Sequence, residues 1–115
     1  MSGEKFETFI LVSAYCTIAF VSLSSPSLRP DAGLPSGNYD HLLAYLLLGA
    51  LTAWIQTHRI ETRWLLLLIP MYAALLELGQ LFIPGRNASV EAFVWSAFGA
   101  ITGVLVGKSA RLLFR

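Results

Sequence analysis

Long runs of apolar residues, separated by short polar connections, make up most of this chain. Four such runs cover residues 6–23, 41–57, 64–83 and 91–107. Each has roughly 17 to 20 residues, and at about 1.5 Å per residue a helix of that length spans about 26 to 30 Å, the thickness of a bilayer core. The pattern predicts a single all-α domain over residues 1–115, with four transmembrane helices.

The connections between these runs contain the residues that end helices. Residues 24–40 hold three of the five prolines and two glycines, and residues 58–63 and 84–90 are short and polar. The first apolar run is longer than the roughly 7 to 15 residues of a signal-peptide core, and no A-x-A cleavage pattern follows it. We therefore expect it to be a retained membrane helix.

Composition supports a membrane protein and excludes a nucleic-acid-binding one. Hydrophobic residues make up 56% of the chain and charged residues only 13%, whereas a soluble domain of 115 residues needs a far more polar surface. The net charge of +1 provides no basic surface for a nucleic acid. Cys16 is the one cysteine, so no internal disulfide can form.

The positive charges predict the orientation in the membrane. With four spans, the two termini and residues 58–63 share one side, and the opposite side holds only Arg29 and Arg86. Positive residues concentrate on the cytoplasmic side of membrane proteins. Both termini are therefore expected in the cytoplasm, on the side that carries Lys5, Arg59, Arg63, Lys108, Arg111 and Arg115.

A few polar residues lie near the outer ends of the apolar runs. Glu77 and Gln80 are three residues apart and share a helix face, and His41 and Tyr45, four apart, do the same on the second helix. An acid in hydrocarbon is costly, so Glu77 is expected to face the bundle interior and to find a partner in His41 or Arg86. The candidate cluster consists of Asp40, His41, Tyr45, Glu77, Gln80, Arg86 and Glu91.

These polar residues also have structural interpretations. Intramembrane Glu and Gln often form hydrogen bonds that hold helices together, and Asp40 could cap the second helix. Asp40, His41, Glu77 and Glu91 are metal-ligand types, but no metal-binding spacing accompanies them, so no metal or cofactor is predicted. No G-x-S-x-G motif is present, and no catalytic residue is assigned.

The fourth apolar run contains small residues at helical spacing. Gly99, Gly103 and Gly107 form G-x-x-x-G-x-x-x-G, which allows another helix to approach closely. This glycine face predicts helix packing within the bundle. The alternative is a surface for a second membrane protein.

Two of these patterns resemble the VanZ-like family of small bacterial membrane proteins. The family pattern Asp-Lys-x-x-His-x-x-x-Tyr-x-x-Leu-Gly is matched by His41, Tyr45, Leu48 and Gly49 in GNYDHLLAYLLLG. The pattern Glu-x-x-Gln-x-x-x-x-Gly-Arg is matched by ELGQLFIPGR, which ends at Gly85 and Arg86, and Gly99 and Gly103 match glycines of the last helix. The resemblance covers about residues 37 to 103. The chain departs from the family at Gly37, Asn38, Ala92 and Ser96, where the family has Asp, Lys, Asp and Asn.

The resemblance implies a multi-pass protein of the bacterial inner membrane with a role in the cell envelope. The family's namesake is associated with low-level teicoplanin resistance. An outer-facing polar cluster fits recognition of a lipid or glycan headgroup, with Arg86 offering two hydrogen bonds to a phosphate or carboxylate. The alternative function is a non-catalytic accessory subunit or assembly factor of a larger membrane complex.

Overall fold

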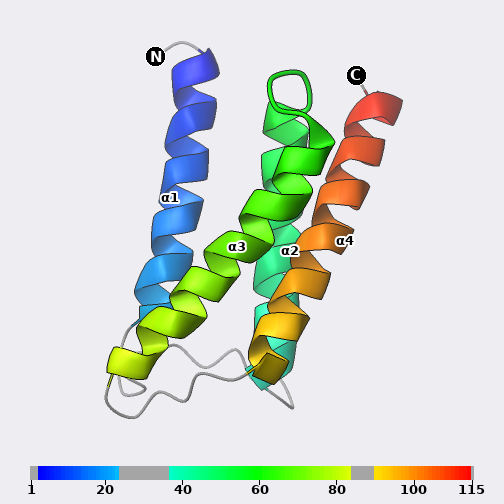
Figure 1. The fold of residues 1–115 in the computed structure, drawn as a ribbon. Coiled ribbons are helices and arrows are strands. Elements are labelled where there is room, and N and C mark those ends of the chain that lie inside the picture. The colour runs from blue at the N-terminus through cyan, green and yellow to red at the C-terminus, as the bar shows by residue number, and fades with distance from the viewer. Residues whose placement is uncertain (1–2, 24–36, 84–89, 115) are drawn as a thin grey trace.

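The structure, a computed structural model, describes residues 3–23, 37–83 and 90–114. In these ranges the chain forms α1 (Gly3–Leu23), α2 (Gly37–Gln56), α3 (Thr62–Gly79), the 3-10 turn η1 (Gln80–Phe82) and α4 (Val90–Phe114). The helices run alternately up and down, and the two termini lie at the same end of the bundle as the connection from α2 to α3 (Figure 1). The all-α prediction is confirmed.

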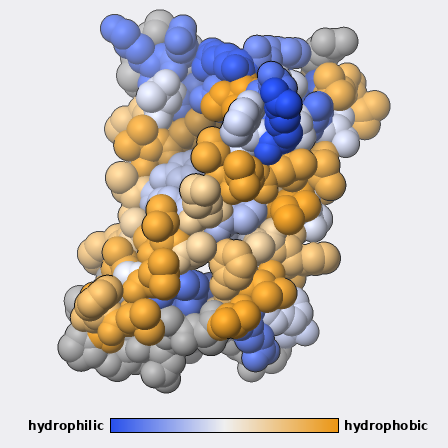
Figure 2. Space-filling view, viewed as in Figure 1, coloured by the Kyte–Doolittle hydropathy of each residue, from blue (hydrophilic) through white to orange (hydrophobic). Residues whose placement is uncertain are grey.

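Three segments of this bundle are long and apolar enough to cross a membrane. They are α1, the continuous helical segment Thr62–Phe82, and α4. Figure 2 shows apolar residues over the middle of the molecule and hydrophilic ones gathered at the end that holds the termini. The longest dimension is 43 Å, close to the roughly 40 to 45 Å of a bilayer with its headgroups.

The second helix does not belong to this set, so the predicted fourth transmembrane helix is not supported. The polar residues Asp40, His41 and Gln56 lie within α2 and lower the mean hydropathy of a helix whose length is otherwise sufficient. The apolar run of residues 41–57 begins after Asp40, whereas the helix begins at Gly37 and therefore includes Asp40.

The observed helix ends differ from the apolar runs for physical reasons. The second helix begins at Gly37, so Asp40 lies within its first turn and is not its cap. The fourth continues to Phe114, past the end of the apolar run, because charged side chains do not interrupt backbone hydrogen bonds. There Lys108 Nζ donates a hydrogen bond to Thr62 Oγ1 (2.5 Å), and the Arg111 guanidinium lies 5.2 Å from the centre of the Trp54 ring.

The parallel helices α2 and α4 form the tightest contact in the fold. A Cβ added at Gly99, Gly103 or Gly107 would meet the backbone of Leu42, Leu46 or Ala50 at distances that real Cβ atoms do not reach. From the other side, Gly49 of α2 has equally little space against the backbone of Ala100 and Val104. Close approach of two backbones through glycine is how helices associate in a membrane, where burial of apolar surface gives no driving force.

The third helix packs against this pair and completes the core. Leu65, Ile69 and Ala73 of α3 are buried in one core cluster that also includes Tyr45 of α2 and Val104 of α4. These three residues recur every four positions and therefore form one stripe along α3. Exposed leucines cover its opposite face, as expected for a helix that meets lipid on that side.

The first helix is attached differently, by polar contacts more than by packing. Only 6% of its apolar stretch is buried, against 39% for α4. The Tyr15 hydroxyl lies 2.9 Å from Thr52 Oγ1 of α2, and the Tyr72 hydroxyl of α3 donates a hydrogen bond to the Tyr15 carbonyl. Hydrogen bonds between membrane helices contribute about 0.6 kcal/mol each on average, so α1 is the least firmly held helix of the bundle.

Candidate functional site

The candidate site lies where the start of α2 meets the end of α3. These helices run in opposite directions, so residues near position 40 come to the same level as residues near position 80 (Figure 1). His41 Nε2 lies 3.6 Å from Glu77 Oε1, at ion-pair distance when the imidazole is protonated. The two side chains remain 21% and 12% exposed, so the pair is sheltered but still reachable from outside.

Gln80 lies on the same face, one turn beyond Glu77, and is itself buried. Its Nε2 donates a hydrogen bond to the carbonyl oxygen of Ser22 at the end of α1 (2.9 Å). The residue begins the 3-10 turn η1, which tightens the end of the third helix. Gln80 therefore connects α1 to α3, which is the helix-linking role that polar residues often have in membrane proteins.

Tyr45 extends the site toward the middle of the bundle. It is buried, and its hydroxyl lies within electrostatic range of Glu77, Tyr72 and Tyr15. With the Tyr15 contact to Thr52, these groups form a polar strip through the interior of α1, α2 and α3. The strip begins at His41 and Glu77, at the end of the bundle.

Asp40 stands beside His41 with an unusual environment. Its Oδ1 is buried, yet it has no hydrogen-bond partner in the part of the chain that the structure describes. A buried carboxylate oxygen normally accepts at least one hydrogen bond, because leaving it without one costs about 1 to 3 kcal/mol. A molecule that reached this oxygen, which neighbouring atoms cover in the structure, would gain by donating a hydrogen bond to it.

The remaining residues of the predicted cluster are less closely defined. Glu91 lies in the first turn of α4 with its side chain exposed. Arg86 falls outside the described residues. Near the same end, Tyr39 of α2 and Trp95 of α4 place their ring centres 5.8 Å apart, the type of aromatic pair that is common at membrane–water boundaries.

The glycine face of α4 is occupied within the chain. Gly99, Gly103 and Gly107 all pack against α2, so another protein could reach them only by displacing that helix. The alternative of an accessory subunit that binds a partner through these glycines therefore has no free surface there. In the described ranges no three His, Cys, Asp or Glu side chains are grouped so that they could hold a metal ion.

Sequence reasoning did not identify the tyrosines and the threonine of the interior strip. Tyr15, Thr52 and Tyr72 each lie in a different apolar run, and no spacing along the chain connects them. The hydroxyls themselves were a signal in the sequence, because a hydroxyl within an apolar run needs a hydrogen-bond partner when it is buried. Assigning the partners required the arrangement of the helices.

The chemistry of the site is that of polar recognition. A carboxylate, an imidazole and a further carboxylate oxygen that has no partner among the described residues can accept or exchange protons and can accept hydrogen bonds from a ligand. Comparison of the chain with protein-family models, with curated proteins and with solved structures finds no match.

Proposed function

We propose that this chain is a VanZ-like protein of the bacterial inner membrane that binds a lipid or glycan headgroup at the outer-facing cluster around His41 and Glu77. The single observation that carries the proposal is the 3.6 Å approach of the two side chains, made across two helices and left partly exposed. Purely structural pairs in a membrane interior gain by being fully enclosed, whereas a recognition site needs an opening.

The proposal includes a fourth membrane crossing by α2 and a cytoplasmic location of both termini. A central helix needs less apolar surface than a peripheral one, and α2 is packed against α4 along its length and also against α3. Positive residues concentrate at the end with the termini, including Lys5, Arg59, Arg63, Lys108 and Arg111. The cluster around His41 then faces the outside of the cell.

Reporter fusions test this topology. A reporter active only in the cytoplasm is expected to give full signal at both termini, and a reporter active only in the periplasm is expected to give none. The charge asymmetry of the chain is the physical reason. A periplasmic signal from either terminus would rule out the orientation.

The variant Glu77→Gln tests the binding function. The amide keeps the size of the side chain but removes its charge, so headgroup binding is expected to weaken by about tenfold or more, as for the loss of a hydrogen bond to a charged group. Lipids from a bacterial polar extract that remain bound to the purified protein are measured by native mass spectrometry.

Glu61→Gln is the matched control for this variant. Glu61 is exposed at the opposite end of the bundle, where its Oε2 lies 3.0 Å from Arg63 Nε. The control should retain the wild-type set of bound lipids, and both variants should insert and accumulate normally. Equal lipid binding by Glu77→Gln and by the wild type would show that the His41–Glu77 pair only holds helices together.

A further inference from the structure

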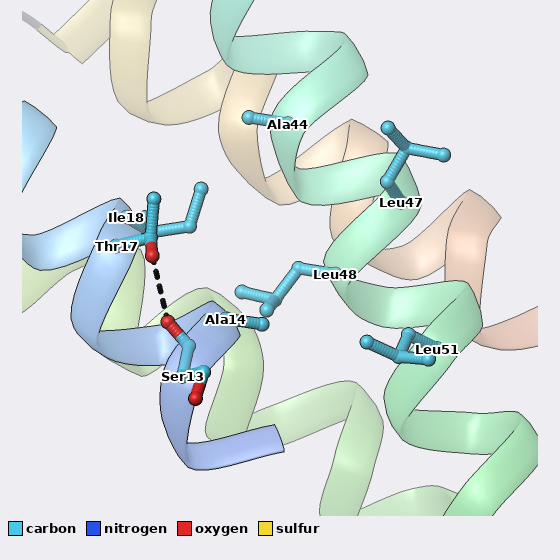
Figure 3. Close-up of a pocket in the computed structure, with 8 residues that line it drawn as sticks. All are labelled: Ser13, Ala14, Thr17, Ile18, Ala44, Leu47, Leu48 and Leu51. Atoms are coloured by element: carbon cyan, nitrogen blue, oxygen red, sulfur yellow. Dashed lines mark hydrogen bonds between the residues drawn. The ribbon is translucent and has the colours of Figure 1, made fainter. Parts of the chain in front are cut away.

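An apolar groove runs between α1 and α2, beside the candidate site. Its volume is about 430 Å³, and it is lined by Ser13, Ala14, Thr17, Ile18, Ala44, Leu47, Leu48 and Leu51. Figure 3 shows that side chains of both helices border it, with Ala44 and Leu51 at different levels of α2. Ligand pockets in proteins usually measure about 300 to 1,000 Å³, so this groove is large enough for part of a ligand.

The groove is almost free of polar groups that would need a partner. The hydroxyl of Thr17 already donates a hydrogen bond to the carbonyl oxygen of Ser13 (2.8 Å), as the dashed line in Figure 3 marks. The other lining side chains, apart from that of Ser13, are aliphatic. A hydrocarbon chain fits this surface, and a polar solute does not.

The groove continues toward Asp40 along one face of α2. Ala44 follows Asp40 by four positions and Leu47 follows it by seven, so the three residues form a row on the helix. Asp40 therefore lies about one helical turn, or roughly 6 Å along the helix axis, beyond Ala44, and its buried Oδ1 has no hydrogen-bond partner among the described residues. Along α2, and so along the membrane normal, the apolar groove is followed by Asp40, a hydrogen-bond acceptor.

We propose that the α1–α2 groove holds an acyl chain of a membrane lipid whose headgroup donates a hydrogen bond to Asp40 Oδ1. The inference rests on the proposed function and makes its ligand specific: a lipid with N–H or O–H donors, such as an ammonium group or a sugar hydroxyl. His41 follows Asp40 in the chain and lies 3.6 Å from Glu77, so this pair contacts the same headgroup.

Two features favour a lipid chain over a second copy of the protein. Leu47, which lines the groove, is 67% exposed on the apolar flank of the bundle, where lipid is the abundant neighbour. An apolar helix from a second copy could cover the groove but would supply no donor for Asp40 Oδ1. A lipid can cover the apolar surface with its acyl chain and can donate a hydrogen bond to the buried oxygen from its headgroup.

Native mass spectrometry of the full chain in nanodiscs tests the proposal with three lipids. Phosphatidylethanolamine and phosphatidylcholine have the same charges, but only the first has N–H donors. A glycosyl diacylglycerol offers hydroxyl donors instead and so distinguishes the two sources of the donor. We expect retention of phosphatidylethanolamine, of the glycolipid or of both to exceed that of phosphatidylcholine by about tenfold.

Two variants separate the groove from the headgroup contacts. Ala44→Phe fills the groove and is expected to abolish retention of the lipid, whereas Val94→Phe adds the same ring at an exposed position of α4 and should change nothing. Asp40→Asn replaces one acceptor oxygen by a donor and is expected to remove the preference over phosphatidylcholine while the chain remains bound. Thermal unfolding of each variant shows whether it is folded.

Three results would overturn the proposal. The first is that the wild type retains phosphatidylcholine as well as it retains phosphatidylethanolamine and the glycolipid. The second is that folded Ala44→Phe retains as much lipid as the wild type. The third is a dimer mass in place of a protein–lipid mass. If Ala44→Phe retains a headgroup that Glu77→Gln loses, the groove is excluded but the headgroup site stands. If neither variant changes retention, both proposals fail.

Discussion

The variant Gly103→Leu is expected to prevent formation of the folded bundle. A Cβ at this position would lie 2.9 Å from the backbone nitrogen of Ala50 and even closer to the carbonyl oxygen of Leu46. These are backbone atoms of α2, so they cannot rotate away as a flexible side chain would. Overpacking a well-packed core costs about 1 to 3 kcal/mol, and forcing two backbones apart along a whole helix contact should exceed the upper value.

The measurement is the yield of monodisperse protein after detergent extraction, together with its thermal unfolding. Gly3→Leu is the matched control, because a Cβ at Gly3 has no atom within 4 Å. Gly103→Ala should fall between the two, since its single methyl group meets the same backbone with fewer atoms. If Gly103→Leu unfolds at the temperature of the wild type, α2 and α4 are not packed as described.

The packing of α2 against α4 shows how far sequence reasoning reaches in this fold. The spacing of Gly99, Gly103 and Gly107 predicts a close helix contact, because only glycine permits such an approach. The sequence could not identify which helix makes the contact. The structure places α2 there, and the complementary position is Gly49, which belongs to no glycine repeat.

The ends of the helices illustrate a second limit. Apolar runs report which residues lie in hydrocarbon, and they end where charged residues begin. Helices end where backbone hydrogen bonding ends, and neither Asp40 in α2 nor Lys108 in α4 interrupts it. The polar start of α2, from Gly37 to His41, is therefore part of the helix, and this rigid backbone positions the side chains of Asp40 and His41.

The candidate site was predictable as a group of residues but not as a set of contacts. The cost of placing an acid in hydrocarbon was enough to expect that Glu77 turns inward toward a partner. His41 lies at ion-pair distance from it, whereas Gln80 contacts the backbone of Ser22, which no sequence rule identifies. The groove beside α1 could not be predicted from the sequence either, because it depends on how loosely α1 packs against α2.

Replacing both members of the His41–Glu77 pair by leucine is expected to abolish headgroup binding without unfolding the protein. The single change His41→Leu removes the imidazole that lies 3.6 Å from the sheltered carboxylate of Glu77. It should lower the free energy of unfolding by about 2 kcal/mol or more. The double variant His41→Leu/Glu77→Leu removes both polar groups together. Apolar replacement of a buried pair is often neutral or stabilising.

The double variant therefore separates stability from function, which His41→Leu cannot do. Its thermal unfolding in detergent is expected to match or exceed that of the wild type, while lipid retention in native mass spectrometry falls at least as far as in Glu77→Gln. If the pair existed only to hold α2 against α3, its loss would leave lipid binding intact. If the double variant folds as well as the wild type and loses the lipid, the polar pair serves binding and not folding.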